Sequence, residues 1–155
     1  MKKALLAIVM LVAFGWSMNA QNAIGLRGGW GGTELSYQKG LGSNRLELDL
    51  GWWGNNHDHW NYIYLCGVYQ WTGTITGPLG WYAGVGANLG LFTGDAIHND
   101  NLGLALGVQG GLELGLDDLI GIPFQLTLDV RPMWNFIGHN SGFGWGAALG
   151  LRYKF

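Results

Sequence analysis

Apolar and polar residues alternate with a period of two through most of this chain, and this pattern constrains its fold more than any other feature. Successive side chains of an extended strand point to opposite faces, so such runs indicate β-strands and exclude helices as the main element. Turn residues separate the alternating stretches. They divide the chain into eight segments: about 23 to 31, 33 to 39, 45 to 53, 60 to 71, 79 to 92, 102 to 116, 123 to 134 and 143 to 155.

The two faces of these segments differ in charge. One face is apolar and uncharged: Leu46, Leu48, Leu50, Trp52, Leu102, Leu104, Leu106, Val108, Phe124, Leu126, Leu128, Val130, Trp145, Ala147, Leu149, Leu151, Tyr153 and Phe155. The other face carries cations and anions that cancel: Arg27, Glu34, Arg45, Glu47, Asp49, Glu113, Asp129, Arg131, Arg152 and Lys154. A charge facing mid-bilayer lipid costs about 2 to 4 kcal/mol, and closure of a sheet satisfies its backbone groups. The pattern predicts an all-β, eight-stranded antiparallel up-and-down transmembrane β-barrel with its apolar face outward.

A soluble barrel would show the same alternation with its apolar face inward, and composition separates the two. Charged residues make up only 12% of the chain, against about 25% in an average soluble protein. The 29 glycines and nine tryptophans suit a tight wall with anchors at the membrane surface. Aromatic residues also form two predicted rims, with Trp30, Trp52, Trp134 and Phe143 at one end and Tyr37, Trp71, Trp81, Phe124, Tyr153 and Phe155 at the other.

The N-terminal segment has the pattern of an export signal. Lys2 and Lys3 precede an apolar run from Ala4 to Trp16, and the small-residue stretch 17–20 follows. The run is shorter than the roughly 20 residues of a spanning helix. We therefore predict a cleaved signal peptide over residues 1–20 and one barrel domain over residues 21–155. Cys66 is the only thiol, so it forms no internal disulfide.

The chain resembles the small eight-stranded bacterial outer-membrane β-barrel family, with a layout similar to OmpX and the membrane domain of OmpA. The signal, strand count, alternation and final run 149–155, which ends on Phe155, carry the resemblance. It implies a monomer in the outer membrane that contacts lipid and lipopolysaccharide and is recognised by the barrel-assembly machinery through its C-terminal strand. With a periplasmic N-terminus, the outward connections are 31–32, 54–59, 93–101 and 135–142, and the periplasmic turns lie near 40–44, 72–78 and 117–122.

Eight strands enclose a lumen that side chains can fill. Inward glycines leave room for larger inward residues such as Tyr62, Tyr64 and Asn88, and these glycines are Gly84, Gly86, Gly90, Gly103, Gly107, Gly144, Gly146 and Gly150. The ten inward charges are expected to form a salt-bridged plug, since buried charges persist when paired. We expect no wide porin and no cofactor. A narrow gated ion path is the alternative interpretation of this network.

All four histidines fall in the predicted outward loops: His57, His59, His98 and His139. With Asp58, Asp95 and Asp100 they could form a metal site if the loops converge, although no loop has a dense zinc-type pattern. A polar loop surface is the simpler interpretation. These loops contain no lysine or arginine, so they offer nothing for phosphate or nucleic acid and favour cationic or neutral partners.

An enzymatic alternative rests on His139 and Ser141. This pair resembles that of the outer-membrane lipid A deacylase barrels, which combine a histidine and a serine with a glutamate. The chain departs from that pattern because no carboxylate follows Ser141, so the acid would have to be Asp95 or Asp100. We therefore expect a structural or surface-interaction protein and not an enzyme. The glycine-rich run 84–90 has the wrong spacing for a phosphate loop and is predicted to be barrel wall.

Overall fold

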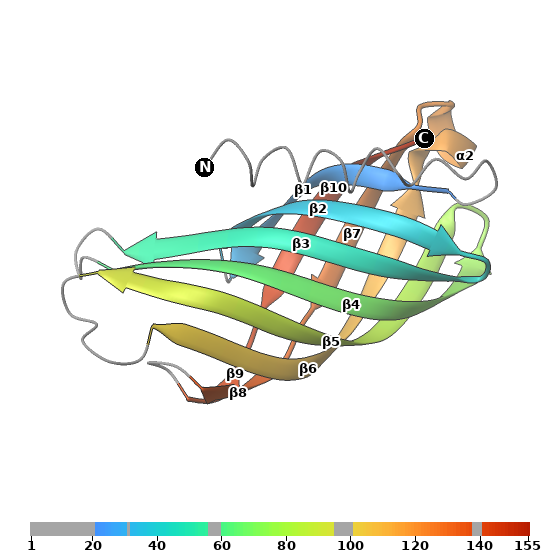
Figure 1. Ribbon diagram of the computed structural model, residues 1–155. Coiled ribbons are helices and arrows are strands. Elements are labelled where there is room, and N and C mark those ends of the chain that lie inside the picture. The colour runs from blue at the N-terminus through green and yellow to red at the C-terminus, as the bar shows by residue number, and fades with distance from the viewer. Residues whose placement is uncertain (1–20, 31, 56–59, 95–100, 138–140) are drawn as a thin grey trace.

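The computed structural model describes residues 21–30, 32–55, 60–94, 101–137 and 141–155, and the side chains of residues 55 and 60 are not among the described parts. It is built almost entirely of strands, with one short helix (Figure 1). The elements are β1 (Ala23–Trp30), β2 (Gly32–Leu41), β3 (Asn44–Asn55), β4 (Trp60–Thr76), β5 (Leu79–Gly94), β6 (Leu102–Gly115), α2 (Leu116–Ile120), β7 (Phe124–Val130), β8 (Met133–Ile137), β9 (Gly142–Gly144) and β10 (Ala147–Lys154).

These segments form eight barrel strands, because the last two strands are each interrupted once. β7 and β8 both pair with β6, and the break between them lies at Arg131 and Pro132. β10 pairs with β7 and β9 pairs with β8, with a break at Trp145 and Gly146. Every neighbouring pair is antiparallel, and β1 pairs with β10, which closes the sheet. The predicted fold class is confirmed: the chain forms a closed eight-stranded antiparallel barrel.

The connections differ from the sequence prediction in several places. The predicted turns near 40–44 and 72–78 are mostly strand, since β2 and β3 leave only Gly42 and Ser43 between them and β4 continues to Thr76. Positive φ angles at Gly42 (71°) and Gly77 (48°) allow these tight turns. The loops predicted at 54–59 and 135–142 are likewise trimmed by β3, β8 and β9, and Gly32 belongs to β2.

The connection between β6 and β7 is predicted from the sequence as a turn over 117–122. In the structure it contains the helix α2. Gly121 ends this helix with a φ of 75°, and its N–H donates to the carbonyl of Asp117. Two acidic residues occupy the first turn, where they interact favourably with the helix dipole. Among the described residues no helix is long and apolar enough to cross a membrane.

The barrel is apolar outside and polar inside. Fully buried side chains include Glu47, Asp49 and Arg152, whereas large apolar residues on every strand are exposed. The outward residues predicted from the sequence are all exposed or half-exposed, including Leu48, Leu106, Leu128, Leu149 and Leu151. Such a surface matches lipid and not water, and closure leaves no sheet edge along the charged part of the lumen. The fold is therefore a transmembrane barrel.

Candidate functional site: the charged lumen

Arg131 lies at the centre of the lumen, in the break between β7 and β8, and its side chain is 5% exposed. Its Nη2 donates to Glu47 at 2.8 Å and to Asp49 at 2.5 Å, both on β3. Its Nη1 donates to Glu34 on β2 at 3.3 Å. One guanidinium thus joins three carboxylates from two strands on the opposite wall.

Arg27 on β1 links the same cluster to β7. Its Nε donates to Asp129 at 3.1 Å, and its two other nitrogens bond Asp129 and Glu34. Tyr82 on β5 also donates to Asp129, at 2.8 Å. Tyr64 on β4 donates to Glu34 at 2.6 Å. Both carboxylates therefore have several donors, as buried charges require.

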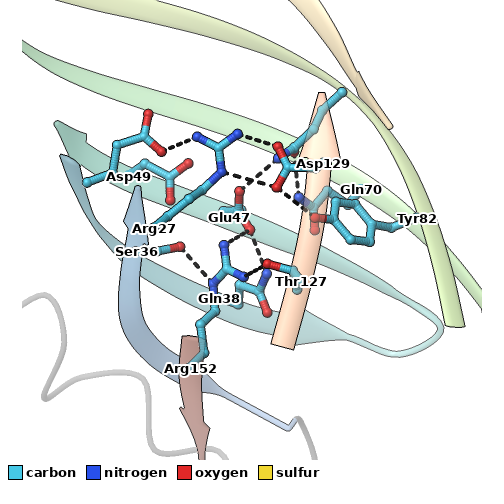
Figure 2. Close-up of polar contacts among 12 residues, drawn as sticks. Arg27, Ser36, Gln38, Glu47, Asp49, Gln70, Tyr82, Thr127, Asp129 and Arg152 are labelled. Atoms are coloured by element: carbon cyan, nitrogen blue, oxygen red, sulfur yellow. Dashed lines mark hydrogen bonds and ion pairs between the residues drawn. The ribbon is translucent and has the colours of Figure 1, made fainter. Parts of the chain in front are cut away.

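Arg152 forms the layer nearer the chain termini. Figure 2 shows its side chain extending from β10 toward Ser36, Glu47 and Thr127. The distances are 2.9 Å to Ser36, 3.0 Å to Glu47 and 2.8 Å to Thr127. Glu47 thus accepts from Arg131 on one carboxylate oxygen and from Arg152 on the other. This residue joins the two layers into one network that crosses the lumen.

Neutral polar residues extend this network, and the sequence analysis did not identify them. Gln38 donates to Glu47 at 2.5 Å, Gln109 donates to Glu47 at 3.2 Å, and Gln70 donates to Gln109 at 2.6 Å. They occupy inward positions of the alternating pattern, so extending the analysis from charged to neutral polar residues would have found them. We call the buried network the plug: Arg27, Glu34, Ser36, Gln38, Glu47, Asp49, Gln70, Tyr82, Gln109, Thr127, Asp129, Arg131 and Arg152.

The other predicted charges lie at the lumen mouth near the chain termini. Arg45 pairs with Glu113 at 2.5 Å, and Gln125 donates to the same carboxylate at 2.7 Å. Lys154 pairs with Asp117 of α2 at 2.6 Å. This hydrogen bond to the ammonium group lowers the pKa of the Asp117 carboxyl below its ordinary value. The structure thus divides the ten predicted charges between a buried plug and a partly exposed mouth, and the hydrogen bond from Arg45 to Gln70 links the two.

Aromatic rings fill the lumen between the plug and the barrel end that lies opposite the chain termini. Tyr62 stacks on Phe92 with 4.1 Å between ring centroids and on Tyr64 with 5.1 Å. Glycines on facing strands make this possible, because a Cβ at Gly90 or Gly51 would lie within 2.5 Å of a tyrosine ring. A large inward residue therefore fills the space beside Gly90, as predicted, and also the space beside Gly51, which the sequence analysis did not name.

Two cavities lie on either side of the plug. The larger, about 670 Å³, is the polar mouth near the termini, and its lining includes Arg45, Glu113 and Lys154. The smaller, about 160 Å³, lies at the opposite end beside the tyrosine rings, and its lining includes Arg27, Glu34 and Arg131. The plug residues that separate these cavities are almost fully buried.

All the histidines and acids of the proposed metal and enzyme sites lie outside the described residues: His57, Asp58, His59, Asp95, His98, Asp100 and His139. Ser141 is described and is exposed beside β9. Within the described ranges no cluster of three histidine, cysteine or acidic side chains has the geometry of a metal site. Both ideas therefore stay sequence-based predictions.

Comparison with known proteins gives one structural neighbour and no sequence relative. No family model and no curated protein matches the chain. The barrel is similar to the crystal structure of Neisserial surface protein A (NspA), with a TM-score of 0.63 and 16% sequence identity. The match covers 88% of this chain and 94% of NspA. At this identity the similarity supports the fold alone.

Proposed function

We propose that this protein is an integral outer-membrane barrel that acts at the cell surface through its loops, with a lumen that the plug keeps closed. The observation that carries the proposal is the network of Arg27, Arg131 and Arg152 with four carboxylates across the whole lumen. A sealed interior leaves the loops and the outer wall as the surfaces available for partners. NspA, which has the same fold, is by its name a surface protein, and the proposal extends that location to this chain.

The proposal includes export, location and partners. Residues 1–20 act as a cleaved signal peptide, and residues 21–155 insert in the outer membrane as a monomer among lipid and lipopolysaccharide. The barrel-assembly machinery recognises the final strand ending at Phe155. The protein belongs with the small eight-stranded outer-membrane barrels, among which OmpX and the OmpA membrane domain are its expected counterparts. The loops at the end opposite the termini face outward and bind cationic or neutral partners.

Location is tested first by fractionation and by migration on a gel with and without boiling. We expect the protein in the outer-membrane fraction with a shift on boiling, because closed barrels resist detergent until heated. A periplasmic protein without a shift would overturn the proposal. Mass measurement of the purified chain then shows whether it begins at Gln21.

Orientation is tested with a matched pair of cysteine variants. Ser141 and Ser43 are both exposed and lie at opposite ends of the barrel, while Cys66 is fully buried and should not react. A large maleimide reagent that cannot cross the outer membrane should label Ser141→Cys on intact cells. Ser43→Cys should react only after the membrane is permeabilised. The reverse pattern would place the loops in the periplasm and exclude the surface role.

Closure of the lumen is tested by conductance in planar bilayers. The parent protein should give no steady current because side chains occupy the lumen. A sustained ion current through the parent would support the narrow-channel alternative. Glu47→Ala with Arg152→Ala should raise the current, since these two residues join both layers of the plug.

A further inference from the structure

The connection between β6 and β7 exposes a group of apolar side chains at the barrel end that holds the termini. Leu119 and Ile120 of α2 are 57% and 63% exposed, and Ile122, which follows the helix, is 40% exposed. The two other described connections at this end are tight turns, each with one large exposed aliphatic side chain, Leu41 or Ile75. We call Leu119, Ile120 and Ile122 the apolar tip. Such a group is a candidate contact surface for lipid or for another molecule.

The other side of the same connection is polar and faces the lumen mouth. The Asp117 carboxylate pairs with the Lys154 ammonium group at 2.6 Å, and Asp118 lines the larger cavity. The three residues of the apolar tip do not line this cavity. The connection is therefore amphipathic, with its acidic side chains turned toward the mouth and its apolar tip turned away from it.

Hydrogen bonds and aromatic contacts join this connection to the lipid-facing wall. Phe124, the first residue of β7, contacts Tyr153 of β10 edge to face, with 5.5 Å between ring centroids. Tyr153 in turn stacks on Phe155 with 6.4 Å between centroids. The Lys154 N–H donates to the Pro123 carbonyl at 2.8 Å, which holds the end of the connection against β10, and Figure 1 shows α2 beside the C-terminus. The apolar tip therefore leads directly into an outward aromatic row, Phe124, Tyr153 and Phe155.

The apolar tip lies at the depth of the lipid headgroup layer. Outward aromatic residues near strand ends mark the level at which a barrel wall meets the headgroups. Ile122 is two residues beyond Phe124, a distance of at most about 7 Å along the chain at about 3.3 Å per residue. The polar layer of a bilayer is about 5 to 7 Å deep on each side. Since α2 also contacts β7, the helix stays close to this layer.

The charges of the connection show which part of the lipid it fits. Residues 119–124 contain no charged side chain, and the only charges on α2 are those of Asp117 and Asp118. Segments that anionic headgroups attract carry lysine or arginine on their polar side. This connection has neither, so its contact with a membrane depends on buried apolar surface and needs no anionic lipid.

We propose that the connection between β6 and β7 is an interfacial membrane anchor. Its apolar tip inserts among the glycerol groups and the upper acyl chains of the adjacent leaflet, next to Phe124 and Phe155. The ion pair of Asp117 with Lys154 holds the polar side of α2 over the lumen mouth, so that the tip points toward lipid. The inference rests on the barrel being in a membrane, and not on which end faces the cell exterior.

The test places a fluorophore on Ile120→Cys and, as the matched control, on Ser43→Cys in the exposed β2–β3 turn at the same end. Cys66 is buried and should not react. The full barrel in phosphatidylcholine vesicles is exposed to two quenchers: iodide on both sides of the membrane, and phosphatidylcholine with a nitroxide at the top of its acyl chain. The Ile120→Cys probe should be quenched by the nitroxide and several-fold less by iodide than the control. The Ser43→Cys probe should show the reverse.

Two variants, measured with the probe on Ile122→Cys, test whether apolar side chains cause the insertion. Leu119→Asn with Ile120→Asn should reduce nitroxide quenching several-fold and raise iodide quenching. Asp118→Asn changes the polar side of the same helix and should leave both values unchanged. Adding phosphatidylglycerol to the vesicles should leave nitroxide quenching of the parent unchanged, since no cation in the connection attracts this lipid. The shift on boiling confirms that each variant is folded.

Three results would overturn the inference. Equal iodide quenching of the Ile120→Cys and Ser43→Cys probes would show that the tip lies in water. Protection from iodide without nitroxide quenching would show that a second copy of the chain covers the tip. Nitroxide quenching that persists in the folded Leu119→Asn, Ile120→Asn variant would show that the tip does not drive insertion. A parent protein without the shift on boiling would instead contradict the proposed function, so the two failures are distinguishable.

Discussion

The plug and the lumen mouth contain the same chemical groups at different depths. In the plug the side chain of Arg131 is 5% exposed, those of Glu47 and Asp49 are 0% exposed, and the one guanidinium pairs with both carboxylates. At the mouth the carboxylate of Glu113 is 21% exposed and that of Asp117 is 34% exposed, and each meets one cation. Water can replace a lost partner at the mouth but not in the plug. The depth of a charge pair in the lumen, and not its residue types, therefore decides how much the pair contributes to stability.

Removing the most connected charge should give the largest effect. Arg131→Met deletes the partner shared by Glu34, Glu47 and Asp49, and leaves an uncompensated buried charge. We expect the free energy of unfolding to fall by about 3 to 5 kcal/mol. Urea unfolding in detergent, followed by the gel shift, measures it.

Lys154→Met is the matched control at the mouth, because it deletes one cation whose carboxylate partner, Asp117, is 34% exposed. Its expected loss is below about 1 kcal/mol. Equal losses in the two variants would show that depth does not distinguish the two regions.

The next prediction moves a charge to the other face of the wall. Leu128 lies on the outer face of β7, between two inward residues of the plug, and is 55% exposed to lipid. Leu128→Arg should destabilise the barrel by about 2 to 4 kcal/mol, since no partner or water compensates the charge there. Unfolding in lipid vesicles measures the effect, with Leu128→Ala as the control for lost apolar surface. A loss no greater than that of the control would contradict the assignment of this face to lipid.

A smaller change removes one neutral hydrogen-bond donor to a plug carboxylate. Tyr64→Phe keeps the ring that fills the space beside Gly51 but deletes the hydroxyl that donates to Glu34. We expect a loss of about 1 to 3 kcal/mol, because a buried charged acceptor loses a hydrogen bond. The control is Tyr69→Phe, whose hydroxyl accepts from the part-buried Asn44 near the mouth. If both variants lose the same stability, the plug is no more sensitive than the mouth.

The sequence predicted the barrel well because alternation reports directly on the two faces of a strand. The charges at 27, 34, 47, 49, 129 and 152 could be assigned to the lumen simply because they fall on the polar face of the alternating pattern. The specific partners could not be assigned, since Arg27 and Asp129 are 102 residues apart and meet only through the registers of several strands. Pairing across a lumen depends on strand stagger, which no single segment encodes.

The missed features are those that leave the alternation unchanged. Arg131 and Met133 both face inward on either side of Pro132, so the break between β7 and β8 has no signature in the pattern. The helix α2 has only five residues, too few to show helical periodicity. The unequal strand lengths were missed as well, since strand ends are the least certain part of any such prediction.

The smallest expected effect concerns the pair Lys154–Asp117, and it is a pH effect. Because the pKa of Asp117 is lower in the folded barrel than in the unfolded chain, ionised Asp117 stabilises the folded state. This contribution is fully present above the ordinary carboxyl pKa of about 3.9 and disappears as the pH falls through the lowered value. Since the carboxylate is partly exposed, the gain is at most about 1 kcal/mol.

Asp117→Asn should therefore lower stability slightly at pH 7 and leave it unchanged at a pH below the lowered pKa of Asp117, where the parent carboxyl is also protonated. Asp118→Asn removes the same charge from the neighbouring exposed position and corrects for net charge. The measurement is the difference in unfolding free energy between the two variants as a function of pH. The effect should also weaken with salt, because the mouth is open to water. A difference that is independent of both pH and salt would show that Asp117 acts through helix packing, and the mouth would then resemble the plug more than its exposure indicates.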